Sequence, residues 1–143
     1  MKNDKNVESV LKDDGVDFSL LNPGHNFENI NTTNIKHLEN KLNIERDQSW
    51  AVRVIYNKRF GGVIIKQNPG EGNRRHYHPD ADECWVVLEG SYEWEIDGKT
   101  KIVNVGDIIL VKAKTWHKIT AVGKVPAARL AITKPDVNHI YED

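Results

Sequence analysis

The sequence predicts an all-β domain, an antiparallel sandwich or barrel, preceded by a short N-terminal helical arm. From Trp50 onward, short runs rich in β-branched and aromatic residues alternate with turn residues. The pair Asp97-Gly98 lies between two of these runs and is a strong hairpin signal. No helical pattern separates the runs, so neighbouring strands are expected to pair in an antiparallel way.

The first 46 residues are expected to form the arm, and residues 47–143 the barrel domain. The chain changes character near Asp47, because the segment before it is rich in Asn, Asp and Lys. Apolar spacing in the arm predicts two short helices. The first contains Val7, Val10 and Leu11 and ends near Gly15; the second follows the stretch NTTN, which can cap it, and contains Ile35, Leu38 and Leu42.

The barrel domain is expected to contain about eight short strands with tight turns between them. Besides the segment that holds His76, the predicted strands are residues 50–56, 63–67, 84–90, 91–96, 99–105, 106–111, 117–122 and 127–133. Pro135 is expected to end the series. A chain of 143 residues suits one such domain.

Composition excludes several classes of function. The formal net charge is −1 and no basic stripe with interleaved aromatic residues is present, so a nucleic-acid partner is not expected. No apolar run is long enough to span a membrane, and the first ten residues are too polar for a signal peptide. The single cysteine, Cys84, cannot form an internal disulfide and fits a reducing compartment. A cytoplasmic location is the expectation.

Two histidines one residue apart are the strongest chemical signal. Successive side chains of a strand point to opposite faces, so His76 and His78 project the same way, roughly 7 Å apart. Glu83 opens the returning strand and can face the same interior, while His117 borders a later strand and is the best-placed fourth ligand. These residues predict a metal site, and the alternative is a polar loop without metal.

The spacing of these residues resembles the first motif of the cupin superfamily, G-x5-H-x-H-x4-E-x6-G. Gly70, His76, His78, Glu83 and Gly90 match that motif without departure. The resemblance extends over roughly residues 50 to 134 and identifies a small single-domain cupin.

The second cupin motif, G-x5-P-x-G-x2-H-x3-N, is matched in part. Gly106 and His117 are in place, whereas Lys112, Lys114 and Ala121 stand where the motif has proline, glycine and asparagine. These departures affect the turn before His117 more than the ligand itself.

The resemblance implies a double-stranded β-helix of jelly-roll type with one metal inside the barrel. Carried over by position, the ligands would be His76, His78, Glu83 and His117. Three imidazoles and one carboxylate suit a divalent transition metal: Fe, Mn, Ni, Co or Zn. An octahedral ion held by four ligands keeps two positions open for substrate, water or O₂.

Four other residues are candidates for binding a substrate. Arg74 is expected on the face of the two motif histidines, and Trp85 on the face of Glu83. Arg53 and Arg129 alternate with apolar residues in predicted strands. An arginine there either faces solvent or points inward and holds an anion, and Trp85 is either core or pocket wall. The remaining histidines, His25, His37 and His139, are expected at the surface.

The sequence therefore predicts a metal-dependent cupin that acts on a small, anionic molecule in the barrel. The reaction could be that of a dioxygenase, or an isomerisation, decarboxylation or lyase reaction that uses the ion as a Lewis acid. A non-catalytic module that binds or senses metal and ligand is the alternative. No catalytic acid or base can be assigned. A homodimer is expected, because a sandwich has strand edges to cover.

Overall fold

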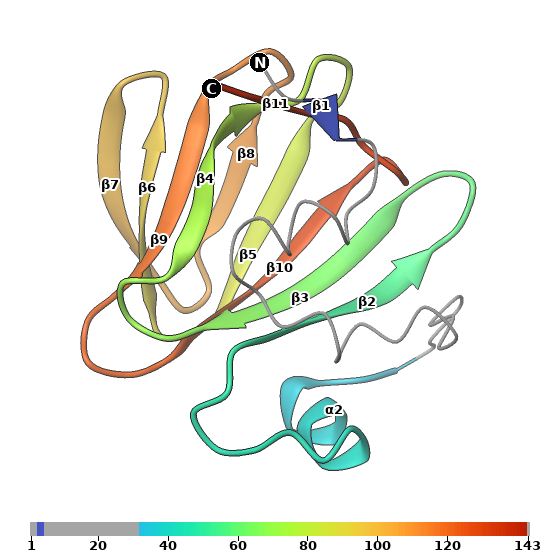
Figure 1. Cartoon of the computed structure of the whole chain (residues 1–143), viewed down its shortest axis with the longest axis vertical. Coiled ribbons are helices and arrows are strands. Elements are labelled where there is room, and N and C mark those ends of the chain that lie inside the picture. Colours follow the sequence, from blue (N-terminus) through green and yellow to red (C-terminus); the bar gives the residue numbers. More distant parts are fainter. Residues whose placement is uncertain (1–2, 5–31, 143) are drawn as a thin grey trace.

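The computed structural model describes residues 3–4 and 32–142 of the chain, and it is built from two antiparallel sheets (Figure 1). The first sheet has the order β1-β11-β4-β9-β6-β7, with β1 Asn3–Asp4, β11 His139–Tyr141, β4 Gly72–Tyr77, β9 His117–Val122, β6 Ser91–Ile96 and β7 Lys99–Asn104. The second has the order β2-β3-β10-β5-β8, with β2 Trp50–Tyr56, β3 Gly61–Gln67, β10 Ala127–Thr133, β5 Glu83–Glu89 and β8 Ile108–Val111. This arrangement confirms the predicted all-β class and the double-stranded β-helix.

The main core lies between the two sheets. Trp85 and Val87 of β5 meet Tyr92 of β6 and Ile119 of β9 there, and all four are buried. Along β5 the buried residues alternate with half-buried ones, as expected for a strand with one face in the core. Glu83 lies on the buried face as well, so the same alternation that builds the core also directs a carboxylate into the barrel.

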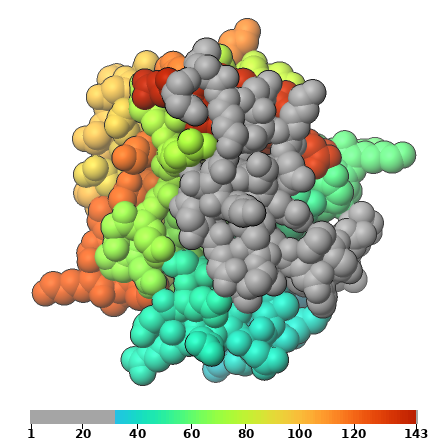
Figure 2. Space-filling model, in the orientation of Figure 1, coloured from blue at the N-terminus to red at the C-terminus, as the bar shows by residue number. Residues whose placement is uncertain are grey.

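A second cluster covers the outer face of the second sheet. Helix α2, Ile35–Lys41, begins after Asn34, whose side chain accepts a hydrogen bond from the backbone N–H of His37 at 2.8 Å. Its buried Leu38 packs with Trp50 and other apolar residues of β2 and β3. In Figures 1 and 2 this segment lies at the bottom of the molecule. The predicted second helix is thus confirmed, and the one expected near residues 7–15 lies outside the described residues.

The expectation that Pro135 ends the series of strands is wrong. After it, β11 pairs with β4, with Ile140 opposite Tyr77 and Tyr141 opposite His76. The backbone of β1 in turn pairs with β11. A strand of three residues is too short to show alternation in the sequence, and its pairing partner lies more than sixty residues earlier in the chain. No helix within the described ranges is long and apolar enough to cross a membrane.

Strand β4 is irregular just before the first motif histidine. Against β9, Asn73 pairs with Ile119 and His76 pairs with His117, so β4 has one extra residue between the two pairs. Because of this bulge, Asn73 and His76 are both buried although their spacing is odd. A regular strand would have placed Arg74, rather than Asn73, on the face of His76.

Candidate metal centre

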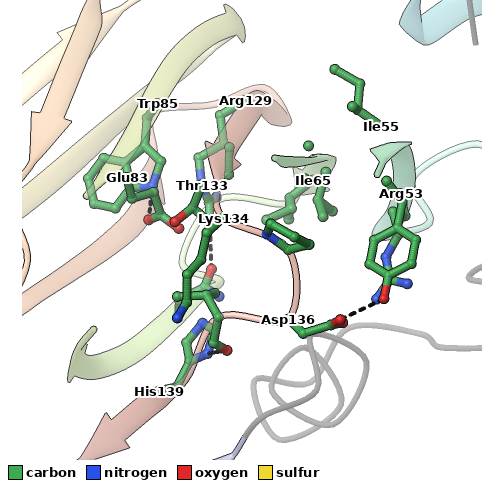
Figure 3. A pocket seen from close by; sticks show the side chains of 18 of the residues that line it. Arg53, Ile55, Ile65, Glu83, Trp85, Arg129, Thr133, Lys134, Asp136 and His139 are labelled. Atoms are coloured by element: carbon green, nitrogen blue, oxygen red, sulfur yellow. Dashed lines mark hydrogen bonds between the residues drawn. The ribbon is translucent and has the colours of Figure 1, made fainter. Parts of the chain in front are cut away.

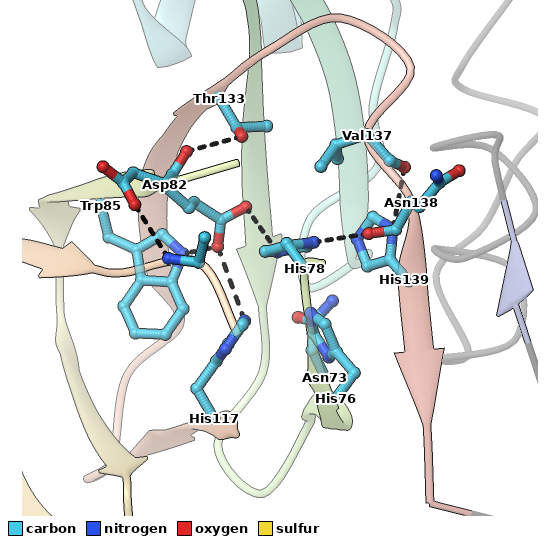
Figure 4. A network of polar contacts seen from close by, with 12 residues as sticks. Asn73, His76, His78, Asp82, Trp85, His117, Thr133, Val137, Asn138 and His139 are labelled. Carbon is cyan, nitrogen blue, oxygen red and sulfur yellow. Dashed lines mark hydrogen bonds and ion pairs between the residues drawn. The ribbon is translucent and has the colours of Figure 1, made fainter. Parts of the chain in front are cut away.

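The four predicted ligands are brought together inside the barrel (Figure 4). His76 lies on β4 and His78 immediately after it, Glu83 is the first residue of β5, and His117 is the first residue of β9. All four are buried, with exposed fractions between 1% for His78 and His117 and 9% for Glu83. Buried titratable groups in such a cluster need charge partners or a bound cation.

Backbone carbonyls orient the imidazole rings. The Nδ1 atoms of His76, His78 and His117 lie 2.6, 2.9 and 2.8 Å from the carbonyl oxygens of Arg74, Asn138 and Thr115, respectively. A carbonyl only accepts hydrogen bonds, so each Nδ1 carries the proton and donates it. The lone pair of each ring is therefore on Nε2. This is the tautomer that a metal ligand requires, and such a contact is the usual support of a metal-binding histidine.

Two of these Nε2 atoms converge on the carboxylate of Glu83. The Nε2 atom of His78 is 3.5 Å from Oε2 of Glu83, and that of His117 is 4.0 Å from Oε1. Both Nε2 atoms are buried and have no hydrogen-bond partner in the part of the chain that the structure describes. Buried polar atoms normally find a partner. A cation between the three side chains would supply it.

Glu83 and His78 each favour the charged form of the other. Burial alone would raise the pKa of Glu83, but the positive charge that His78 carries when protonated outweighs burial and holds the pKa well below its usual value. Burial likewise lowers the pKa of His78, yet the carboxylate of Glu83 raises it above the usual value on balance. Glu83 is therefore ionised at neutral pH, as a metal ligand must be.

The other imidazoles of the cluster are held neutral. Burial, with a contribution from neighbouring histidines, lowers the pKa of His76 well below its usual value. Burial also lowers the pKa of His117 to about 4, against the opposing effect of Glu83. Neutral imidazole is the form that coordinates a metal, so these two rings can coordinate without first losing a proton.

His139 belongs to the same cluster, which corrects its expected place at the surface. It is 7% exposed, and its ring centroid lies 4.5 Å from that of His78 and 4.8 Å from that of His76. Its Nδ1 faces the carbonyl of Val137 at 3.2 Å, and burial lowers its pKa to about 3. The sequence carried no signal for this position, because only the pairing of β11 with β4 brings His139 to the motif. His37 is exposed, as expected, and His25 lies outside the described residues.

The five metal-capable residues form two overlapping groups. His76, His78 and His139 form one, and His78, Glu83 and His117 the other; within each group the ligand atoms lie within 4.8 Å of one another. The four ligands predicted from the sequence are thus divided between the groups, with His78 shared. Imidazole nitrogens and a carboxylate oxygen fit Fe, Mn, Ni, Co or Zn better than Ca or Mg, which prefer all-oxygen sites.

We expect the metal-free protein to lose stability as the pH falls below about 6.5, the pKa of an unfolded histidine. Because the pKa of His117 is about 4 and that of His139 about 3 in the folded protein, the unfolded state binds more protons as the pH falls toward these values. At about pH 5.5 the loss is about 1.4 kcal/mol for each of the two residues. The raised pKa of His78 acts in the opposite direction and offsets part of it.

Urea unfolding in the presence of a chelator, at about pH 7.5 and about pH 5.5, measures this difference. An equal free energy of unfolding at the two pH values would show that the histidines are not buried in the neutral form.

A cavity adjoins the cluster and opens from it between the sheets (Figure 3). Its volume is about 60 Å³. At about 10–15 Å³ for each water position, this is room for a small molecule of few heavy atoms. The residues that line it and carry polar groups include His76, Glu83, His139, Asn73, Arg129, Arg53, Thr133 and Lys134.

Arg129 is the buried cation of this cavity. It is 2% exposed and lies in β10. Its guanidinium donates to Oε1 of Gln67 at 2.7 Å and to Oδ1 of Asn73, and it lies 5.0 Å from the ring centroid of Tyr92. Its Nε atom is buried without a partner, and no carboxylate among the described residues forms an ion pair with it. A buried charge without a counter-ion is costly, so this guanidinium is suited to receive an anion.

Trp85 and Arg53 also line the cavity. The indole Nε1 of Trp85 donates to Oε1 of Glu83 at 2.5 Å, which fixes the orientation of the carboxylate. The guanidinium of Arg53 lies 4.4 Å from the ring centroid of Tyr56. The Tyr56 hydroxyl donates to Asp136 at 2.6 Å. In Figure 3, Arg53 and Asp136 lie on the other side of the view from Glu83 and Trp85.

The bulge in β4 corrects the expected geometry of Arg74. Arg74 does not line the cavity, and its guanidinium lies 3.8 Å from the ring centroid of Tyr141. The neighbouring Arg75 forms ion pairs with Glu95, at 3.2 Å, and with Glu142. Asn73 takes the inward position and holds Arg129. Substrate binding by Arg74 stays a prediction that no longer has the support of a shared strand face.

Comparison with known proteins decides the family. Residues 63–133 match the family model of the cupin domain. The chain contains a cupin domain. This segment includes all four ligands that the sequence predicts, whereas His139 lies beyond its C-terminal end.

Part of the chain is similar in sequence to proteins of an archaeon and of bacteria. "Uncharacterized protein MJ1618" of Methanocaldococcus jannaschii is 34% identical over 64 residues, which are 45% of this chain and 51% of that protein. "Polyketide synthase CurC" of Streptomyces cyaneus is 29% identical over 86 residues, which are 57% of this chain and 55% of that protein. The alignments span about half the length of each relative.

Solved structures share the fold. KdgF from Halomonas sp. is 21% identical with a TM-score of 0.58, over 64% of this chain and 82% of that one. A predicted oxalate decarboxylase from Thermotoga maritima is 21% identical with a TM-score of 0.57, over 61% and 80%. A sugar phosphate isomerase of the cupin superfamily from Silicibacter pomeroyi is 26% identical with a TM-score of 0.51, over 53% and 50%.

The backbone explains the glycines of the cupin motifs. Gly90 has a φ of +63°, and a Cβ there would lie 2.5 Å from the carbonyl oxygen of Pro126, so only glycine fits. Gly70 and Gly106 also have positive φ values, +92° and +91°. Lys114, where the second motif has glycine, keeps the left-handed conformation with φ +64°, and its N–H donates to the carbonyl of His78 at 2.7 Å. The turn before His117 therefore holds a non-glycine residue in a conformation that glycine adopts more readily.

Proposed function

We propose that this cupin binds one divalent transition metal and acts on a small anionic molecule in the barrel. The observation that carries the proposal is the shared cavity. His76, Glu83 and His139 line it together with Arg129, a buried guanidinium without a carboxylate partner among the described residues. A metal cluster and an anion receptor that open into one small cavity are the parts needed to hold a charged substrate against a metal.

Separate residues would bind the ligand and orient the metal ligands. Arg129 would bind the carboxylate or another anionic group of the ligand, with Gln67 and Asn73 holding the guanidinium in place. Trp85 would keep one oxygen of Glu83 oriented through its indole N–H. The bound metal would supply Lewis acidity or a site for O₂.

The names of two structural neighbours support an anionic substrate. The predicted oxalate decarboxylase is named for a dicarboxylate, and the sugar phosphate isomerase for a phosphate ester. Decarboxylation, isomerisation and lyase chemistry can all use a Lewis acid next to a charged group. A dioxygenase reaction also fits the ligand set, because the same ions can bind O₂. Similar folds host different reactions, so the substrate and its products have to identify the reaction.

A non-catalytic role in binding or sensing is the alternative, and one observation favours it. Apart from the metal-capable residues and the arginines, the acidic and basic groups that line the cavity already have partners. Lys134 pairs with Asp80, and Asp136 accepts a hydrogen bond from Tyr56. No general acid or base is therefore evident outside the cluster among the described residues.

Metal analysis of the full chain, purified without added metal, tests the proposal first. We expect about one equivalent of a divalent transition metal per chain. Calorimetric titration of the metal-loaded protein with small mono- and dicarboxylates should then show binding, with weaker binding of the matching uncharged amides. Product analysis of the bound acids, with and without O₂, separates an oxygenase, a Lewis-acid enzyme and a binding module. Absence of metal, or equal affinity for acids and amides, would contradict the proposal.

Self-association stays a prediction. Strands β7 and β8 are edge strands of the two sheets, and Ile102, Ile108 and Leu110 on them are about half exposed or more, at 49%, 72% and 59%. Exposed apolar residues at a strand edge are a common site of association between subunits. The cytoplasmic location also stays a prediction.

A further inference from the structure

His139 is a fifth metal-capable side chain in the cluster and lies outside both cupin motifs. It comes from the C-terminal strand β11, which the pairing of Tyr141 with His76 fixes beside β4. This pairing turns the imidazole of His139 into the barrel, where 7% of the residue is exposed. In Figure 4 its ring lies beside those of His76 and His78.

His139 makes the same kind of backbone contact as the motif histidines. Its Nδ1 faces the carbonyl of Val137 at 3.2 Å, which leaves the lone pair on Nε2 as in the other three rings. Its ligand atom forms a group with those of His76 and His78 in which all lie within 4.8 Å of one another. The trans ligands of an ion with bonds of about 2.1 Å are about 4.2 Å apart, so a small adjustment of the side chains suffices to close this group around an ion.

We propose that His139 is a further ligand of the metal held by His76, His78, Glu83 and His117. This inference rests on the proposed function, since it presumes that the cluster binds a metal. His78 belongs to both groups of ligand atoms. It connects the group with His76 and His139 to the group with Glu83 and His117. Four imidazoles and one carboxylate leave one open position on an octahedral ion, not two. Arg129, which lines the same cavity, would then be the main anchor for the anionic group of a substrate.

Cobalt binding by the full chain tests this inference. We expect His139→Asn and His139→Ala to weaken Co(II) binding at least about tenfold and to change the visible absorption spectrum of the bound ion. His37→Ala, which removes an exposed histidine of α2, should leave both unchanged. Circular dichroism of each metal-free variant checks the fold, and asparagine keeps an N–H that can donate to Val137.

X-ray absorption of the Zn(II)-loaded wild-type chain needs no variant. Four imidazoles in the ligand shell are expected, and three would overturn the inference. A wild-type affinity and spectrum in the His139 variants would overturn it as well, while the proposed function would stand. Weaker binding with an unchanged spectrum would also count against it, because that is the result of a residue that only positions the ligands. If the wild-type chain binds neither Co(II) nor Zn(II), the proposed function itself fails.

Discussion

Replacing His78 with alanine should abolish stoichiometric metal binding. His78 is the residue that the two groups of ligand atoms share, so its replacement removes one ligand from each group. Metal affinity should fall by roughly 100-fold or more, because even the loss of an outer hydrogen-bond partner of a metal ligand costs about 10–100-fold. Metal content after dialysis, measured by mass spectrometry, gives the result directly.

His78→Ala also leaves Glu83 buried without its nearest positive partner, which lies 3.5 Å away. The metal-free variant should be less stable for this reason, by about 3–5 kcal/mol if Glu83 stays ionised. His78→Gln serves as a second variant, whose side-chain amide can donate a hydrogen bond to the carboxylate. His37→Ala, at an exposed position, is the matched control for the loss of a histidine. Full metal occupancy in a folded His78 variant would exclude the site described above.

Replacing Arg129 with methionine should weaken the binding of small carboxylates strongly without changing metal content. The guanidinium is 2% exposed, has no carboxylate partner among the described residues and lines the cavity next to the histidine cluster. A charged hydrogen bond to the ligand is worth about 1.5–3 kcal/mol, which corresponds to a loss of about 10- to 150-fold in affinity. Calorimetric titration of metal-loaded wild type and variant compares the two affinities.

Two controls separate recognition of an anion from packing. Arg129→Lys keeps the charge but cannot contact Gln67 and Asn73 with a planar fork, so an intermediate affinity is expected. Arg75→Ala removes an arginine that pairs with Glu95 and Glu142, and it should leave binding unchanged. If Arg129→Met lowers only the free energy of unfolding and binds carboxylates as the wild type does, Arg129 is a structural residue.

Local patterns in the sequence were sufficient for the fold class and for the predicted ligand set. Alternating apolar residues and turn signals predict strands because both act over a few neighbouring residues. The spacing of His76, His78 and Glu83 is equally local, since it spans one strand end, one turn and the start of β5. The shared face of Glu83 and Trp85 followed from alternation alone and agrees with the burial along β5.

The errors have one physical cause, which is that contacts between distant segments leave no local pattern. The bulge in β4 exists only relative to β9. It places Asn73, rather than Arg74, at the inward position. His139 is buried only because β11 pairs with β4, and a three-residue strand has no periodicity to detect.

By itself, the sequence determined a β-barrel of cupin type and indicated four candidate metal ligands, which lie on strands of both sheets or next to them. Only the tertiary structure decided which side chains share the cavity. Arg129 is a buried cation there because Gln67 and Asn73, each more than fifty residues away in the chain, contact its guanidinium. His139 joins the cluster because β11 pairs with β4. Register and strand pairing depend on the free energy of the whole packed barrel, and local preference does not specify them.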